Sequence, residues 1–286
     1  MSAKEKIKKL LPPPFVKLVG MVLNLPVRHR SNLYDAAFKS ILSGEVLVEP
    51  GNLSGEYWLD VRSHLVRRLV LKGNYEPEVA VALLKYLKGD FVDVGANVGF
   101  FSIHVASNAP ADCKVLAIEP NSKALSYLKR NTARNSLSET IVVEDCAVSD
   151  TAGEIVMNTY EGMEEYTSIS EQQHPSVQEK KALQFKVKTV TLDELVKRHG
   201  IAPGLIKIDA EGAELQVLLG MGNILAKFKP AVICEIGGNT FGADNSALIN
   251  FIEKNQYALF DLSGEPLTLD KDFGGEILML PETTVS

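Results

Sequence analysis

Short apolar runs alternate with helical patterns along the chain from about residue 90 onward. Seven of these runs have the length and composition of buried strands, namely residues 91–94, 114–119, 140–148, 205–209, 231–236, 257–262 and 276–281. Between them, apolar residues recur at helical spacing in residues 98–107, 122–134, 192–199, 211–226 and 245–255. Strands that alternate with helices predict an α/β protein whose mainly parallel, doubly wound sheet is covered by helices on both faces.

Two further strand patterns interrupt this regular order. Residues 154–160 and 185–192 look like strands, and a polar linker over residues 161–184 separates them. The linker is longer than a typical connection in a compact domain, and long loops of this kind are often functional. The last two apolar runs, 257–262 and 276–281, are expected to form an antiparallel pair at one edge of the sheet.

The first part of the chain is less regular. Residues 1–75 show helical and irregular patterns, and the prolines at positions 12–14 end any helix there. Residues 77–89 have the pattern of an amphipathic helix, with Pro77 suited to its first turn. The sequence therefore predicts an N-terminal helical extension over residues 1–75 and a larger α/β domain over residues 76–286.

The composition is that of a soluble globular protein, with 45% hydrophobic and 23% charged residues. The net charge of −6 gives no general attraction to a phosphate backbone, so nucleic acid is not an expected partner. The three cysteines, Cys113, Cys146 and Cys234, are widely spaced, and we expect reduced, mostly buried thiols. No cluster of His, Asp and Glu has the spacing of metal ligands, so no metal is implied.

The N-terminal segment is basic around a short apolar middle, over residues 4–30. No apolar run in the chain reaches the roughly 18 to 20 residues that a membrane span needs. The segment lacks a convincing small-residue cleavage site, which argues against a signal peptide. We expect a cytoplasmic protein, and the basic segment leaves open a weak contact with a membrane surface.

A glycine-rich turn, "FVDVGANVGFFS" over residues 91–102, connects the first predicted strand to a helix. Gly95 and Gly99 remove side chains where the backbone turns and where the helix approaches a ligand. The backbone N–H groups of such a turn are free to donate hydrogen bonds. The next strand ends at Glu119, whose carboxylate can accept hydrogen bonds from both hydroxyls of a ribose.

The charges around this turn bear on whether the ligand is a dinucleotide with a pyrophosphate or a nucleoside cofactor without phosphate. The dinucleotide fingerprint G-x-G-x-x-G is not matched, because residues 95–100 read "GANVGF" and Asn97 takes the central glycine position. Asp93 would repel a pyrophosphate but suits a cationic amino-acid group. S-adenosylmethionine has ribose hydroxyls, an ammonium group and no phosphate, so it fits better than NAD. The alternative is structural: Asp93 as a helix N-cap and Glu119 as a solvated strand end.

The sequence resembles the FkbM family of S-adenosylmethionine-dependent methyltransferases. The resemblance covers about residues 76–240 and is carried by these segments: "FVDVGANVGFFS", "AIEPN" (117–121), "CAVSD" (146–150), "VKTVTLDEL" (187–195) and "LIKIDAEGAE" (205–214). The last segment is the most family-specific, whereas the first is shared by methyltransferases generally. The resemblance implies a Rossmann-like class I methyltransferase fold with a seven-stranded sheet.

The resemblance also implies roles for individual residues. It assigns the loop on the methionine side of the cofactor to Asp93, Gly95, Asn97 and Gly99, and the ribose to Glu119. Two residues at the end of the third strand, Asp145 and Cys146, correspond to positions that flank the adenine. Glu76 matches an acid before the first core helix and is expected to face the entrance of the cofactor site.

The "KIDAEGAE" segment is the expected place of the chemistry. Lys207 and Asp209 are two residues apart on a strand, so their side chains point to the same face. Glu211 follows near the start of the next helix. Methyl transfer to oxygen requires a positioned hydroxyl and at most the removal of its proton. Asp209, Glu211 or a desolvated Lys207 could act as the base. In the structural alternative, Lys207 and Asp209 pair with each other and Glu211 caps the helix.

The sequence thus predicts transfer of a methyl group from S-adenosylmethionine to a hydroxyl of a small molecule or glycan. The family is associated with sugars and secondary metabolites, and the linker over residues 161–184 and the N-terminal region are expected to select the acceptor. Two alternatives remain open at this point: an NAD-dependent oxidoreductase on a similar fold, and a non-catalytic accessory protein. A nucleic-acid methyltransferase is disfavoured by the negative net charge. The oligomeric state is not predicted.

Overall fold

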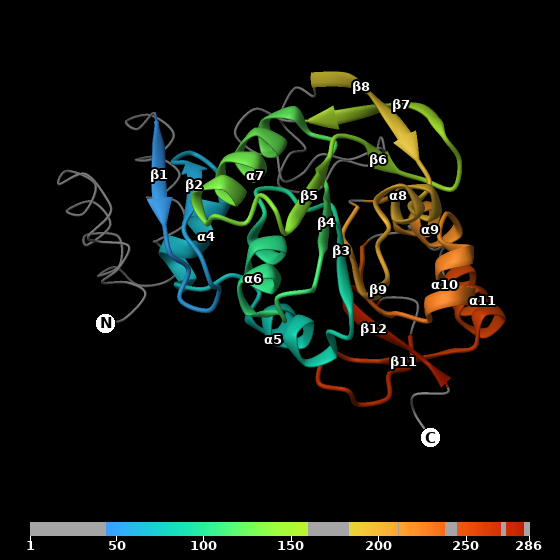
Figure 1. Ribbon diagram of the computed structural model, residues 1–286. Helices are drawn as coiled ribbons and strands as arrows, with labels where there is room; N and C mark the ends of the chain where they lie inside the picture. The colour runs from blue at the N-terminus through green and yellow to red at the C-terminus, as the bar shows by residue number, and fades with distance from the viewer. Residues whose placement is uncertain (1–43, 160–182, 211, 238–244, 270–272, 283–286) are drawn as a thin grey trace.

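The computed structural model describes residues 44–159, 183–210, 212–237, 245–269 and 273–282 of the chain (Figure 1). The basic N-terminal segment, most of the predicted linker, and Glu211 lie outside these described residues. The membrane contact, the acceptor-selecting linker and the role of Glu211 therefore stay predictions.

The centre of the fold is one seven-stranded sheet. Its strands are β3 (Asp90–Val94), β4 (Val115–Ile118), β5 (Ile141–Glu144), β9 (Pro203–Ile208), β10 (Ala231–Ile236), β11 (Tyr257–Phe260) and β12 (Gly275–Pro281). They lie in the order β11-β12-β10-β9-β3-β4-β5. The five strands from β10 to β5 run parallel, and β12 runs antiparallel to both of its neighbours. The predicted mainly parallel sheet with an antiparallel edge pair is confirmed.

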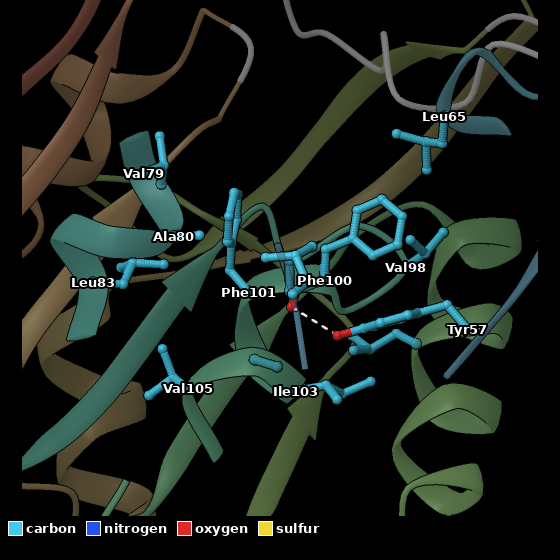
Figure 2. Packing of buried hydrophobic residues seen from close by; sticks show 14 of the residues in the cluster. Tyr57, Leu65, Val79, Ala80, Leu83, Val98, Phe100, Phe101, Ile103 and Val105 are labelled. Atoms are coloured by element: carbon cyan, nitrogen blue, oxygen red, sulfur yellow. Dashed lines mark hydrogen bonds between the residues drawn. The ribbon is translucent and has the colours of Figure 1, made fainter. Parts of the chain in front are cut away.

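Helices cover both faces of this sheet (Figure 1). On one face lie α5 (Pro77–Tyr86), α6 (Phe100–Asn108) and α7 (Ser122–Arg134), in one hydrophobic cluster with strand residues such as Phe91 and Leu205. Figure 2 shows Val79, Leu83 and Ile103 of this cluster. A second hydrophobic cluster, with Val92 and Ile206, contains α8 (Leu192–His199), α9 (Glu214–Leu219), α10 (Gly222–Phe228) and α11 (Ser246–Asn255). Consecutive strand residues enter opposite clusters, as the two-residue period of a strand requires.

Side-chain caps fix the ends of two helices where the sequence predicts them. The Asn121 side chain accepts hydrogen bonds from the backbone N–H groups of Lys123 and Ala124, so α7 starts at Ser122. Thr191 accepts from the N–H of Glu194 at the start of α8, and Gly200 ends that helix in a left-handed conformation. Local polar side chains therefore set these bounds.

One predicted helix is broken in two. Residues 211–226 were expected to be continuous, but α9 ends before Gly220 and α10 starts at Gly222. Two glycines this close weaken a helix. The chain also passes so close to Ser149 that a Cβ on Gly220 would lie 2.2 Å from the Ser149 carbonyl oxygen. The apolar pattern continues across the break, which is why periodicity did not reveal it.

The predicted strand over residues 140–148 also divides. Its first half is β5 of the main sheet, and its second half, β6 (Ala147–Val148), belongs to a separate three-stranded sheet. That sheet also contains the two predicted extra strands, β7 (Gly153–Thr159) and β8 (Leu183–Val190), in the order β6-β8-β7. The chain must leave the main sheet after Glu144, because Ala147 pairs with Thr189 of β8.

The described part of the N-terminal extension is not mainly helical, which corrects the prediction. Residues 45–60 form a hairpin of β1 (Glu45–Val48) and β2 (Tyr57–Asp60), and only α4 (His64–Lys72) is an α-helix. The physical reason is a short alternating pattern, which buries Val46, Val48 and the inward side of β2. These residues join the same hydrophobic cluster as α5 and α6. The boundary at residue 75 stays a prediction.

The described residues can be compared with the expectations for cysteines, membrane spans and metal ligands. Cys113, Cys146 and Cys234 are all buried free thiols, as predicted. Across the described ranges, no helix combines the length and the apolar character that crossing a bilayer demands. Among the same residues, no group of His, Cys, Asp and Glu is arranged to hold a metal ion.

Gly204 of β9 provides a test of the packing behind the site. A Cβ at this position would lie 1.0 Å from the backbone oxygen of Lys88, so Gly204→Ala forces two backbone segments apart. We expect a loss of at least about 2 kcal/mol in the free energy of unfolding, measured by urea denaturation.

Gly222→Ala is the matched control. A Cβ there meets nothing within 4 Å, and the residue opens α10, so we expect stability to be unchanged or slightly raised. Equal unfolding free energies for the two variants would show that the contact at Gly204 does not constrain the fold.

Candidate active site

The predicted glycine turn lies at the carboxyl end of β3, where ligands bind in open α/β sheets. Its residues Gly95, Asn97 and Gly99 all have positive φ angles, of 78°, 51° and 92°. Gly95 is required by a neighbouring loop, because a Cβ there would lie 1.8 Å from the backbone oxygen of Asp209. A Cβ on Gly99 would meet the side chain of Leu128 at 2.7 Å. The need for both glycines is therefore explained by packing within the protein.

Glu119 lies directly beyond β4 and connects two loops of the site. Its carboxylate accepts hydrogen bonds from the backbone N–H of Asn97, at 2.8 Å, and from that of Asn121, at 2.7 Å. The residue is only 6% exposed, so it is not the solvated strand end of the structural alternative. Burial raises the pKa of Glu119 to about 7 in spite of these two hydrogen bonds. Each oxygen keeps lone-pair capacity for a hydroxyl donor.

Asp93 is the most deeply buried acid of the site, at 1% exposure. One carboxylate oxygen accepts a 2.6 Å hydrogen bond from the hydroxyl of Ser102, and the other has no hydrogen-bond partner among the described residues. Asp93 is not a helix N-cap, because α6 begins after Gly99. Burial raises the pKa of Asp93. A buried carboxylate oxygen without a partner suits a cationic ligand group.

Lys207 lies beside Asp93 in the register of β9 and β3 and is 5% exposed. Its ammonium group is 2.9 Å from a carboxylate oxygen of Asp209 and lies 5.2 Å from the ring centroid of Phe101. Burial alone would lower the pKa of Lys207, but the surrounding carboxylates outweigh it and raise the pKa. The raised pKa favours the protonated ammonium at neutral pH, which argues against Lys207 among the three candidate bases.

Asp209 follows β9, and its side chain is 24% exposed. Burial pushes its pKa upward, but the ammonium of Lys207 outweighs burial and leaves the pKa lowered. The predicted structural alternative, a Lys207–Asp209 pair, is thus confirmed. The pair does not exclude a chemical role, because the carboxylate is ionised and reaches the surface of the site.

Glu76 is the residue before α5, and it has an unusual left-handed conformation, with φ 37° and ψ 64°. Its carboxylate accepts a 2.8 Å hydrogen bond from the guanidinium of Arg68. Burial raises the pKa of Glu76, and the charge of Lys207 opposes that rise. The charges of Lys207 and Asp209 both act on the Glu76 carboxyl, and its position at the entrance of the cofactor site stays a prediction.

Asp145 and Cys146 lie at the carboxyl end of β5, as expected, but their side chains differ. Asp145 is exposed, whereas the Cys146 side chain is buried among apolar residues such as Leu192. Burial raises the pKa of the Cys146 thiol to about 12. The Cys146 side chain therefore belongs to the core, and the adenine role of both positions stays a prediction.

Several residues of the site were missed from the sequence. Phe101 and Ser102 contact Lys207 and Asp93, and Asn121 donates its N–H to Glu119. All three belong to the quoted motifs "FVDVGANVGFFS" and "AIEPN", directly beside residues that were singled out. Arg68 lies outside every motif, so no local signal pointed to it.

The residues fit S-adenosylmethionine better than a dinucleotide. Asp93 and Asp209 supply negative charge where a pyrophosphate would have to bind, and Glu119 can accept from ribose hydroxyls. The seven-stranded sheet with one antiparallel strand and this acidic glycine turn together define an S-adenosylmethionine-dependent methyltransferase of the Rossmann-like class I type. Residues 93–259, more than half of the chain, match the family model for the methyltransferase FkbM domain. The chain belongs to the FkbM methyltransferase family.

Similar proteins include methyltransferases of archaea and bacteria. The hexuronic acid methyltransferase AglP of Haloferax volcanii is 29% identical over 178 residues, which cover 61% of this chain and 68% of that protein. The 31-O-demethyl-FK506 methyltransferase FkbM of Streptomyces tacrolimicus is 29% identical over 162 residues, covering 46% of this chain and 60% of that protein.

A third relative and a solved structure are also similar to the chain. Methyltransferase sdnD of Sordaria araneosa is 25% identical over 154 residues, 46% of this chain and 59% of that protein. The crystal structure of methyltransferase FkbM from Methylobacillus flagellatus KT aligns with a TM-score of 0.46 and 15% identity, over 97% of this chain and 58% of that one. The aligned regions span less than two thirds of the length of sdnD and of the Streptomyces protein.

Glu119→Ala tests the ribose assignment. We expect the variant to bind S-adenosylmethionine at least about tenfold more weakly in calorimetry at pH 8, because it loses the acceptor for the hydroxyls. In the wild type, affinity should rise as pH increases through about 7, where the Glu119 carboxyl of the free protein ionises and becomes a better acceptor. The variant should lose that part of the pH dependence.

Glu144→Gln is the control, because Glu144 ends the neighbouring strand but pairs with His199 and Arg198. We expect its cofactor affinity to equal that of the wild type. An unchanged affinity in Glu119→Ala would remove Glu119 from the cofactor site.

Proposed function

We propose that this methyltransferase transfers a methyl group from S-adenosylmethionine to a hydroxyl oxygen of a small molecule, such as a sugar, glycan or secondary metabolite. The observation that carries the proposal is the Asp209 carboxylate, which is ionised, partly exposed and held at the carboxyl end of β9 by buried Lys207. That edge of the sheet is where the reacting part of the cofactor binds in this fold.

The chemistry asks little of the protein beyond positioning. When bound, S-adenosylmethionine supplies a methyl carbon that its sulfonium already activates. Asp209 accepts a hydrogen bond from the acceptor hydroxyl and orients its oxygen. The lowered pKa makes Asp209 a weak base, but a hydroxyl becomes strongly acidic as its oxygen forms a bond to carbon. A weak base that acts late in the reaction is therefore sufficient.

Lys207 contributes through its charge. Its ammonium keeps Asp209 ionised at neutral pH and compensates Asp93 in the same buried region. Glu211, the other candidate base, lies outside the described residues and remains a second candidate. Glu76, Asp93, Asn97 and Glu119 are assigned to the cofactor in this proposal, with Asp145 and Cys146 beside the adenine.

The acceptor class is supported by the names of two relatives. One is a hexuronic acid methyltransferase and another is a 31-O-demethyl-FK506 methyltransferase. Both names favour an oxygen-rich small molecule over a macromolecule. The negative net charge adds to this, since it disfavours a nucleic-acid acceptor.

Calorimetric titration with S-adenosylmethionine, with NAD as the control, is the experiment that tests the cofactor. Formation of S-adenosylhomocysteine is then followed with a panel of hydroxylated sugars and metabolites. We expect binding of S-adenosylmethionine alone and turnover with at least one hydroxylated acceptor. Binding of NAD alone would overturn the proposal, and cofactor binding without turnover on any acceptor would favour the accessory-protein alternative.

Asp209→Asn tests the role of the carboxylate in turnover. We expect kcat to fall by about a hundredfold, since an amide neither takes the proton nor holds the hydroxyl in the same way. The cofactor Kd, measured by calorimetry, should change far less than kcat. Asp150→Asn, at an exposed turn on the same chain, should alter neither quantity. A loss of cofactor affinity as large as the loss of kcat would make Asp209 a cofactor ligand only.

A further inference from the structure

The hairpin of β1 and β2 and helix α4, here called the N-terminal unit (residues 44–75), lies outside the seven-stranded sheet (Figure 1). It packs against α5 and α6 in one hydrophobic cluster. It also leads directly into Glu76, the acid at the entrance of the site. Around Glu76 the unit makes directed polar contacts. The apolar packing of the unit against α5 and α6 would not need such contacts.

Asn52 holds the backbone just before Glu76. Its side-chain amide donates to the carbonyl oxygen of Tyr75 at 2.6 Å and accepts from the N–H of Tyr75 at 2.8 Å. Both backbone polar groups of Tyr75 are thereby satisfied by one side chain. These two reciprocal hydrogen bonds resemble those between paired residues of antiparallel strands, and they fix the backbone directly before Glu76.

Arg68 of α4 holds the Glu76 side chain itself. A guanidinium nitrogen lies 2.8 Å from a carboxylate oxygen of Glu76, and the two side chains are only 27% and 18% exposed. The guanidinium also lies over the Tyr75 ring, 4.8 Å from its centroid. Charge-assisted hydrogen bonds in partly buried surroundings are the strong ones, and stacking orients the planar guanidinium.

These contacts hold a conformation that the chain would otherwise leave. Glu76 has a positive φ and directly precedes Pro77, a position where β or polyproline conformations are favoured. A left-handed non-glycine residue persists only where its surroundings determine it, and such residues gather at functional sites. Asn52 fixes the backbone on one side of Glu76, and Arg68 fixes its carboxylate.

Tyr75, which Asn52 and Arg68 contact, also links the N-terminal unit to the surroundings of Lys207. The Tyr75 ring packs against the rings of Phe100 and Phe101, with centroids 4.8 and 5.8 Å apart. Figure 2 shows Phe101 beside Ala80 of α5, and Phe100 on the side of Val98 and Tyr57. The ammonium of Lys207 lies over Phe101, and Glu76 is one of the three acids whose charge acts on Lys207.

We propose that Arg68 and Asn52 are positioning residues that hold Glu76 in the cofactor site, so that the N-terminal unit completes the site. This inference rests on the proposed function, in which Glu76 belongs to the cofactor. Glu76 acts on the ligand, and Arg68 acts only through Glu76. The unit therefore contributes to cofactor binding, although it lies outside the seven-stranded sheet and outside residues 93–259 that match the family model.

A double-mutant cycle tests the proposal. Affinity for S-adenosylmethionine is measured by calorimetry in the wild type, Arg68→Gln, Glu76→Gln and the double variant. We expect each single variant to bind about tenfold more weakly, and the double variant to bind no more weakly than Glu76→Gln. The affinity should also depend on pH through the ionisation of Glu76, in addition to that of Glu119. In Arg68→Gln, the midpoint of the Glu76 contribution should move to higher pH, since a cation that opposes protonation of Glu76 is lost.

The controls separate positioning from folding. Arg134→Gln breaks a more exposed ion pair, between α7 and Glu56 of the N-terminal unit, that involves none of the residues assigned to the site. It should leave both the affinity and the pH midpoint unchanged. Where Arg68→Gln does not fold, Arg68→Lys keeps the charge but loses the planar fork, and it should weaken binding at an unchanged melting temperature.

The outcomes are distinct from failure of the proposed function, which the wild-type titration alone reveals. Wild-type affinity in Arg68→Gln, or in Arg68→Lys where only that variant folds, would overturn the inference. Losses that add in the double variant would also overturn it, because Arg68 would then act independently of Glu76. Unchanged affinity in Glu76→Gln would remove Glu76 from the cofactor site and leave methyl transfer by the enzyme untouched.

Discussion

The arrangement of the site depends on the electrostatic interaction between the buried ammonium of Lys207 and the carboxylates around it. The ammonium pairs with Asp209 after β9, lies beside Asp93 of β3 and also interacts electrostatically with Glu76 before α5, so one positive charge acts on acids from three segments. Isolated buried charges are costly, and three carboxylates without a local cation would repel one another or take up protons. The ring of Phe101 adds a favourable surface for the same ammonium.

The position of this cation also makes the pKa values of two acids in the candidate site differ. Asp209 contacts Lys207 directly and has a lowered pKa, whereas burial raises the pKa of Glu119 to about 7, and the hydrogen bonds that Glu119 accepts from described residues come from backbone N–H groups. Two carboxylates at the same edge of one sheet thus differ in protonation at neutral pH because of their surroundings. The hydrogen bonds of Glu119 to Asn97 and Asn121 fix its orientation before any ligand binds.

Local patterns predicted the elements of the sheet and much of the site. The alternation of apolar runs with helices predicted the parallel strands and the helices over residues 122–134 and 192–199, whose starts Asn121 and Thr191 cap in the structure. Features that depend on distant segments could not be seen. The chain leaves the main sheet at Asp145 because it pairs with β8, more than 40 residues later. The raised pKa of Lys207 likewise depends in part on Asp93 and Glu76, two acids that belong to other segments.

The contact between Gly95 and Asp209 has a consequence for the order of events on the enzyme. Only the missing Cβ of Gly95 makes room for the backbone oxygen of Asp209, so the glycine turn after β3, proposed to bind the methyl donor, and the loop after β9, proposed to bind the acceptor, adjoin without a gap. A ligand that orders one loop restricts the other before the second ligand arrives, and the second then loses less conformational entropy. Donor and acceptor are therefore expected to strengthen each other's binding, a thermodynamic coupling that passes through a single glycine.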